Sequence, residues 1–136
     1  MIALDTNVMI RLFTRDDEAK AERCFQLLQC ARRGEVELLL CEAVLAEAVY
    51  VLSSSRLYGL SRMQVRDRLL PILELRGVHL QPKCLYRRAL ELYAATNIKF
   101  EDALLVAHME ENGIAQVYSY DQHFDIPDLG VERLEP

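Results

Sequence analysis

Short segments typical of strands recur along the chain, and longer segments with helical spacing lie between them. The strand segments hold three to five residues, at positions 2–4, 36–40, 77–80, 115–118 and 131–134, and the first two are almost entirely apolar. Strands of a parallel sheet show such continuous apolar sequence, and they need long, usually helical connections. The pattern therefore predicts an α/β fold, a three-layer sandwich with a mainly parallel central sheet flanked by helices. The last run is expected to be an edge strand.

Capping and turn-forming residues mark where the helices begin and end. Asp5 to Asn7 follow the first apolar run at once, which indicates a strand that leads directly into a helix. Ser61 is a candidate N-cap, and Pro71 is expected to kink or shorten the helix that follows it. The remaining helices are expected over residues 17–33, 43–56, 61–75, 82–96 and 100–112.

Length and composition fit one soluble domain over residues 1–136, because 51% of the residues are hydrophobic and 27% are charged. No apolar stretch approaches the roughly 18 residues that span a membrane. With an acid already at position 5 and no signal-peptide pattern, the sequence predicts a cytoplasmic protein. None of the four cysteines has metal-site spacing, and Cys24 and Cys41 are expected to be buried, reduced thiols.

The net charge of −5 has the wrong sign for a protein that simply coats nucleic acid. It has the right sign for a protein that gathers carboxylates around a cation. Charge alone does not choose between these classes.

Four acidic residues stand at positions where a ligand site would form. Asp5 and Asp121 each follow a predicted strand, and ligands of parallel sheets gather at the carboxyl ends of the strands. Glu47 has Ala43, Val44, Tyr50 and Val51 as its helical neighbours, and an ionised carboxylate on such an apolar face needs a partner.

Each acid also has a structural alternative. Asp5 is a good helix cap, and Asp121 is a good turn former. Asp102 or Glu101 would interact favourably with the start of the helix near Phe100, and spacing does not separate the two. Glu47 could be held by a basic side chain or a backbone donor. If the carboxylates converge, however, they repel one another, and a hard cation such as Mg²⁺ or Mn²⁺ removes the conflict. Such ions hydrolyse phosphodiesters by activating water.

Four segments, in order, resemble the motifs of PIN-domain nucleases. They are Leu4-Asp5-Thr6-Asn7-Val8, the helical segment from Leu45 to Leu52 around Glu47, Phe100-Glu101-Asp102-Ala103-Leu104-Leu105, and Ser119 to Asp125. The third match selects Asp102 over Glu101. Within the family, the short chain and its Asp-Thr-Asn opening resemble the VapC-type toxins of toxin–antitoxin pairs.

The resemblance implies a magnesium- or manganese-dependent endoribonuclease with Asp5, Glu47, Asp102 and Asp121 as catalytic metal ligands. It also implies a homodimer and a small antitoxin that inserts a segment near the site. Asp125 would be an accessory ligand at most.

Substrate contacts are expected from a few further residues. Ser119 and Asn7 would support a ligand, a water or the substrate. Arg11 is the best candidate for phosphate contact, ahead of Arg15, Arg56 and Arg62, because it lies about two turns along the helix that begins near Asp5. His123, close to Asp121, is a candidate for substrate contact, but a role without substrate is the favoured alternative.

Two other classes of function compete with the nuclease. One is a PIN-like module that has lost catalysis and acts through protein contacts. The other is a phospho-acceptor receiver domain, which needs a strand-end Asp near mid-chain and an acid pair after the first strand. The chain has only Asp5 at that position, and its middle is predicted to be helical.

Overall fold

The computed structural model describes residues 1–136 and contains six α-helices and five short strands. The helices are α1 (Thr6–Thr14), α2 (Glu18–Arg32), α3 (Glu42–Ser53), α4 (Arg62–Leu73), α5 (Lys83–Ala95) and α6 (Phe100–Glu111). The strands are β1 (Ile2–Ala3), β2 (Leu38–Leu39), β3 (Val78–His79), β4 (Gln116–Tyr118) and β5 (Glu132–Leu134). Two 3₁₀ turns, η1 (Gln122–Asp125) and η2 (Pro127–Leu129), connect β4 to β5. Every strand lies within a predicted apolar run, and every predicted helix is present.

Local capping explains where the helices begin. The carboxylate of Asp5 accepts a hydrogen bond from the backbone N–H of Asn7, so Asp5 is the N-cap of α1. Ser61 caps α4 in a reciprocal capping box with Gln64, as its position predicted. Pro71 lies inside α4, which ends two residues later at Leu73, so the proline falls in the last turn of the helix.

All strand pairs are parallel, which confirms the predicted α/β class, but the strands form two separate sheets. The first sheet has the order β1-β2-β3, with Ile2 opposite Leu38 and Leu38 opposite Val78. The second contains only β4 and β5. The sequence predicted one central sheet. The difference arises because β4 does not pair with any strand of the first sheet.

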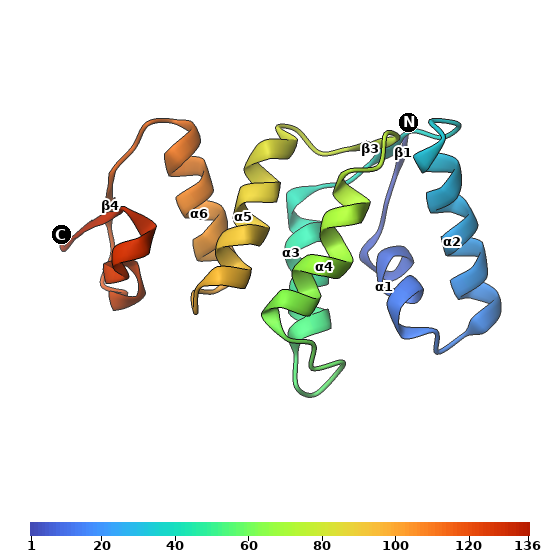
Figure 1. Ribbon diagram of the computed structural model, residues 1–136, viewed down its shortest axis with the longest axis horizontal. Coiled ribbons are helices and arrows are strands. Elements are labelled where there is room, and N and C mark those ends of the chain that lie inside the picture. The colour runs from blue at the N-terminus through green and yellow to red at the C-terminus, as the bar shows by residue number, and fades with distance from the viewer.

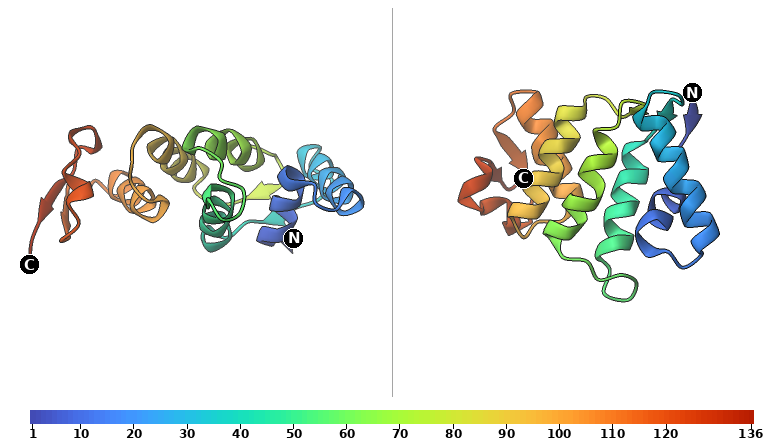
Figure 2. Two further views of the ribbon diagram at one scale, coloured as in Figure 1. Left: turned by 90° about the horizontal axis from the view of Figure 1, so that it is seen from below. Right: turned by 45° about the vertical axis from the view of Figure 1, so that its right-hand side comes forward.

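The two sheets lie at opposite ends of an elongated molecule. In Figure 1 the first sheet lies between α1 and α2 on one side and α3 and α4 on the other, while β4 lies beyond α6 at the far end. Both views in Figure 2 show the same separation between β1 and the C-terminal segment. Helices α4, α5 and α6 pack side by side between these ends.

The core runs through the helical layer and leaves the outer strands exposed. Thirty-one buried residues form one cluster, with Met9, Leu45, Leu69 and Leu90 among its fully buried members. By contrast, the side chain of Ile2 on β1 is 63% exposed and that of Tyr118 on β4 is 70% exposed. Strands of parallel sheets are normally covered on both faces, so β1 and β4 each have surface that nothing in this chain covers.

The cysteines differ from expectation. All four are free thiols, but Cys41 is exposed and Cys24 is only half-buried, so the prediction that both are buried was wrong. Cys41 precedes the first turn of α3, where the chain runs along the surface. None of the helices is long and apolar enough to cross a membrane.

Gly77 is required by a close backbone approach. A Cβ atom at this position would lie 2.1 Å from the carbonyl oxygen of Val36 and 2.8 Å from that of Ala31. Replacing Gly77 with alanine should therefore lower the free energy of unfolding by about 3 kcal/mol, because the backbone must shift. Gly113→Ala is the control: its φ is +66° but nothing lies within 4 Å, so only about 1 kcal/mol of backbone strain is expected. Equal losses in urea denaturation would contradict this account of Gly77.

Candidate carboxylate site

The first acidic group lies where β1 leads into α1. Thr6 follows the capping residue Asp5, is 4% exposed and is the one buried polar residue of the chain. Its hydroxyl donates a 2.8 Å hydrogen bond to Oε2 of Glu47 on α3. A buried hydroxyl needs such a partner, so this bond fixes the Glu47 carboxylate beside the residue that follows Asp5.

Glu47 lies on a face of α3 that is apolar but open to solvent. Glu47 itself is exposed, Ala43 is exposed, and the side chain of Tyr50 is 67% exposed. The sequence predicted that this carboxylate needs a partner because it loses solvation against an apolar surface. In a single chain Glu47 is exposed, so that reason was wrong. Val44 and Val51 pack partly against the core, whereas Glu47 and its neighbours Ala43 and Tyr50 stay exposed. The partner that Glu47 does have is Thr6.

Asp102 and Asp121 form the second acidic group. Burial in the first turn of α6 raises the pKa of Asp102, and the negative charge of Asp121 raises it further, while Lys99 opposes both effects. The pKa of Asp121 is lowered because its carboxylate accepts a 2.9 Å hydrogen bond from the backbone N–H of His123. Glu101, in contrast, is exposed. These contacts support the choice of Asp102 over Glu101.

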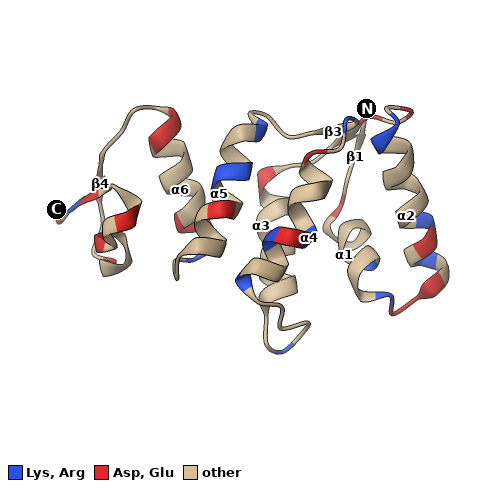
Figure 3. Cartoon of the chain, in the orientation of Figure 1, with Lys and Arg blue, Asp and Glu red and all other residues tan.

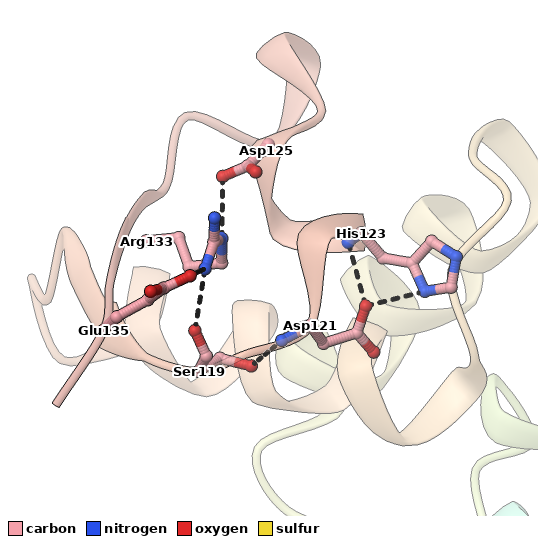
Figure 4. A network of polar contacts seen from close by, with 6 residues as sticks. All are labelled: Ser119, Asp121, His123, Asp125, Arg133 and Glu135. Carbon is pink, nitrogen blue, oxygen red and sulfur yellow. Dashed lines mark hydrogen bonds and ion pairs between the residues drawn. The ribbon is translucent and has the colours of Figure 1, made fainter.

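A network of polar contacts holds Asp121 in place (Figure 4). The Ser119 hydroxyl accepts a hydrogen bond from the backbone N–H of Asp121, and the ring Nδ1 of His123 lies 2.9 Å from the Asp121 carboxylate. His123 thus contacts the acid itself. Ser119 and His123 were predicted to support ligand or substrate, and here each orients Asp121.

Arg133 on β5 ties this segment together. Its guanidinium donates to the carbonyl of Ser119 and to the carboxylates of Asp125 and Glu135, at 3.0, 3.0 and 2.9 Å. These two carboxylates raise the pKa of Arg133 well above its usual range. Asp125 is therefore held by Arg133, which leaves it a supporting role. From the sequence alone, Arg133 is recognisable only as a basic residue in the last strand.

The structure does not gather the four acids into one cluster. It brings Asp102 near Asp121 and links Glu47 to Thr6, but no group of three or more His, Cys, Asp or Glu side chains lies close enough to hold a metal ion. Asp5 follows β1 of the first sheet, and Asp121 follows β4 of the second. Convergence of Asp5, Glu47, Asp102 and Asp121 therefore stays a prediction.

A hollow of about 640 Å³ adjoins the second acidic group. Asp102, Glu101 and Lys99 line it together with Tyr50 and Tyr93. Arg62 donates to the backbone carbonyls of Tyr93 and Ile98, which lie more than 30 residues away along the chain, and its guanidinium lies over the Tyr93 ring. These contacts give Arg62 a structural role, and phosphate contact by this residue stays a prediction.

Acidic and basic residues are interspersed on α2, α4 and α5, whereas α3 and α6 carry acidic residues without Lys or Arg (Figure 3). One small hollow has three basic residues in its lining. It lies where α1 packs on α2, and Asn7, Arg11, Lys20 and Arg23 line it. Arg11 and Arg23 form no ion pair, and Lys20 is only within 4.0 Å of Asp17. Arg15, by contrast, pairs with Glu18 at 3.2 Å. The structure thus places the predicted contacts Asn7 and Arg11 beside two cations that the sequence had not singled out.

The fold and these side chains define the class of the protein. It is an α/β protein with parallel strands and acidic residues just beyond the carboxyl ends of two strands. The family model described as PIN domain matches residues 2–128, and the chain belongs to the PIN-domain family. PIN domains are generally nucleases, act on nucleic acid and generally use a divalent metal ion. A comparison with curated proteins gives no match.

Replacing Asp102 with asparagine should not destabilise the metal-free protein at neutral pH. The pKa of Asp102 in the folded protein is raised above its ordinary 3.8. Ionisation of Asp102 therefore destabilises the fold as the pH rises from 3.8 through the folded pKa. Asparagine does not ionise, so the free energy of unfolding of the Asp102→Asn variant should equal or exceed that of the parent at pH 7, with a smaller advantage at pH 4. Urea denaturation in EDTA at both values measures this. A variant clearly less stable at pH 7 would contradict it.

Proposed function

We propose that the protein is a magnesium- or manganese-dependent endoribonuclease. The observation that carries the proposal is the pair formed by Asp102 and Asp121, in which one carboxylate raises the pKa of the other. A cation between two such groups relieves their repulsion, and carboxylate oxygens are the donors that Mg²⁺ and Mn²⁺ prefer. The donor set of this chain therefore fits the metal that its family generally uses.

In this proposal Asp5, Glu47, Asp102 and Asp121 hold one or two ions, directly or through water. The bound metal supplies an activated water and neutralises charge on the phosphate. The chain's own residues fix the ligands: the hydroxyl of Thr6 orients Glu47, and the backbone N–H and ring of His123 orient Asp121. Ser119 sets the turn that presents Asp121.

RNA binding is assigned to the basic hollow between α1 and α2. Arg11, Lys20 and Arg23 offer three positive charges with little internal neutralisation, and guanidinium groups pair well with phosphate oxygens. Asn7 lines the same hollow, one turn or less from Asp5. A local cluster of positive charges of this kind can bind a phosphate backbone even though the net charge of the whole chain is −5.

We further assign the protein to the VapC-type toxins, as a cytoplasmic homodimer held in check by a small antitoxin. A mostly apolar groove of about 410 Å³ between α1, α2 and α4 suits a segment of such a partner. Leu12, Phe13, Phe25 and Ile72 line it, and Phe25 is 42% exposed. A small reading frame for a DNA-binding protein directly upstream supports this assignment, and its absence argues against it.

The alternative is a catalytically silent PIN-like module that binds other proteins. One observation favours it: the four acids stand in two groups, and no three of them form a metal site within the chain. The nuclease assay below separates the two functions.

Purified protein is expected to cleave RNA with Mg²⁺ or Mn²⁺ and not with EDTA. Asp102→Asn should reduce the rate by about 100-fold or more, because a ligand at the reacting phosphate is lost. Glu101→Gln is the matched control: it removes the neighbouring exposed acid and should leave the rate within about twofold of the parent. Gel analysis of a defined RNA pool measures both. Metal-dependent cleavage that survives Asp102→Asn would indicate a contaminant, and no cleavage by the parent would favour the binding module.

Arg11→Ala should weaken RNA binding at low salt and reduce the dependence on salt. Each lost phosphate contact on a single strand lowers the slope of log K against log salt by about 0.7. Fluorescence anisotropy, in the Asp102→Asn background so that RNA stays intact, gives the slope. Arg32→Ala, an exposed charge on α2 outside the basic hollow, should leave it unchanged. Equal effects of both variants would remove Arg11 from the proposed contact.

A further inference from the structure

The hollow that adjoins Asp102 has a packed aromatic floor. Its volume of about 640 Å³ is in the usual range of small-ligand sites, and its lining comes mainly from α3, α5 and the start of α6. Tyr93 and Phe100 in this lining are 5% and 3% exposed, and their rings pack edge to face with 5.9 Å between the centroids. The guanidinium of Arg62 lies 4.5 Å from the centroid of the Tyr93 ring. The floor is therefore fixed, and one face of Tyr93 is already covered.

Tyr50 on α3 is the aromatic residue of this hollow that stays open. It is 67% exposed, whereas Tyr93 and Phe100 are buried. It belongs neither to the aromatic pair nor to the cation–π contact. A single exposed tyrosine is common on protein surfaces. An exposed tyrosine in the wall of a hollow, however, offers a flat π face to a planar ligand.

Lys99 supplies a positive charge at the same hollow. It is exposed, immediately precedes α6 and forms no ion pair. Burial raises the pKa of Asp102, and the charge of Lys99 opposes that rise. The hydrogen bond from His123 lowers the pKa of Asp121, and the charge of Lys99 lowers it further. Lys99 is therefore near both carboxylates, and a phosphate held by its ammonium group would lie beside the proposed metal ligands.

We propose that this hollow is a nucleobase subsite, in which an unpaired base of the RNA stacks on the Tyr50 ring and the adjoining phosphate pairs with Lys99. Aromatic side chains stack unpaired bases of every kind, because each base has a π face. The inference rests on the proposed function, since Asp102 lines the same hollow as Tyr50. The base held there sets which phosphate lies beside Asp102 and Asp121. Tyr50 is thus a specificity-determining residue.

The charges in the lining favour a nucleotide over a segment of protein or a second copy. Arg62, Lys99, Glu101 and Asp102 all line the hollow. A protein surface that closed over them would take these charges out of water, which is costly unless each one finds a partner. A nucleotide brings a planar base for Tyr50 and an anion for Lys99, and it leaves the exposed Glu101 in solvent.

Photocrosslinking locates the base without any activity. Single-stranded RNA that contains 5-iodouracil is irradiated with the Asp102→Asn variant and Mg²⁺, so that the RNA stays intact, and peptide mass spectrometry identifies the crosslinked residue. Tyr50 should be labelled much more strongly than Tyr118, which is 70% exposed but lies on β4 outside the hollow. Labelling of Tyr118 as strong as that of Tyr50 would mean that crosslinks follow exposure alone, which would overturn the proposal.

Tyr50→Ala should weaken the binding of single-stranded RNA about tenfold, because the stacked ring is lost. The side chain is largely exposed, so the variant should fold as the parent does. Tyr50→Phe keeps the ring, and Tyr118→Ala removes an equally exposed tyrosine elsewhere; both should bind within about twofold of the reference. Duplex RNA should bind equally well with and without the Tyr50 ring, since paired bases cannot reach it. Fluorescence anisotropy with Asp102→Asn as the reference chain measures each affinity.

Lys99→Gln tests the phosphate contact. For single-stranded RNA it should lower the slope of log K against log salt by about 0.7, whereas Lys99→Arg, which keeps the charge, should retain the slope. A slope that Lys99→Gln leaves unchanged would refute this contact.

Failure of the subsite and failure of the nuclease give different results. If the parent cleaves RNA with Mg²⁺ but Tyr50→Ala does not weaken binding, the subsite is refuted and the nuclease stands. If the parent never cleaves RNA but crosslinks form at Tyr50 and Tyr50→Ala weakens binding, the nuclease fails and the subsite stands. If light scattering shows that Tyr50→Ala turns a dimer into monomers while RNA binding is unchanged, a second copy covers the hollow and the proposal is refuted.

Discussion

Repulsion between carboxylates of like charge is the constraint on which the arrangement of this chain depends. Asp102 is partly buried and lies near Asp121, and both conditions raise its pKa. The structure moderates the conflict with nearby donors and cations: Lys99 stands close by, and the backbone and ring of His123 hold Asp121. A fold keeps such a pair at some cost in stability. A cation bound between the two carboxylates would remove that cost.

The second constraint is the need of parallel strands for cover on both faces. β2 and β3 meet it on one face, since Leu38 and Val78 are buried, although Leu39 on β2 is 41% exposed. β1 and β4 do not, and the same two strands precede Asp5 and Asp121. The two strands that lack cover are therefore the same two strands that lead into the separated acidic residues.

Much of the fold was predictable because its signals are local. The capping by Asp5 and Ser61 depends on residues two or three positions away, so the starts of α1 and α4 follow from sequence. Long-range contacts could not be predicted: Thr6 contacts Glu47 across 41 positions, and Arg62 contacts Ile98 across 36. Burial could not be predicted either, since the apolar neighbours of Glu47 do not indicate whether another element packs on them. The acids themselves were identifiable, but their division between two sheets was not.

The charge distribution separates the basic hollow from the acidic pair. The basic hollow of Arg11, Lys20 and Arg23 lies on α1 and α2, at the end that carries Asp5. The acidic pair with the perturbed pKa values lies at the other end, beside β4. Coulombic attraction falls with distance and is screened over about 10 Å in salt, so an anion held in the hollow gains nothing from the distant acidic pair or from a cation bound there. The proposed RNA contacts and the proposed metal ligands therefore act together only on a strand long enough to reach both ends of the molecule.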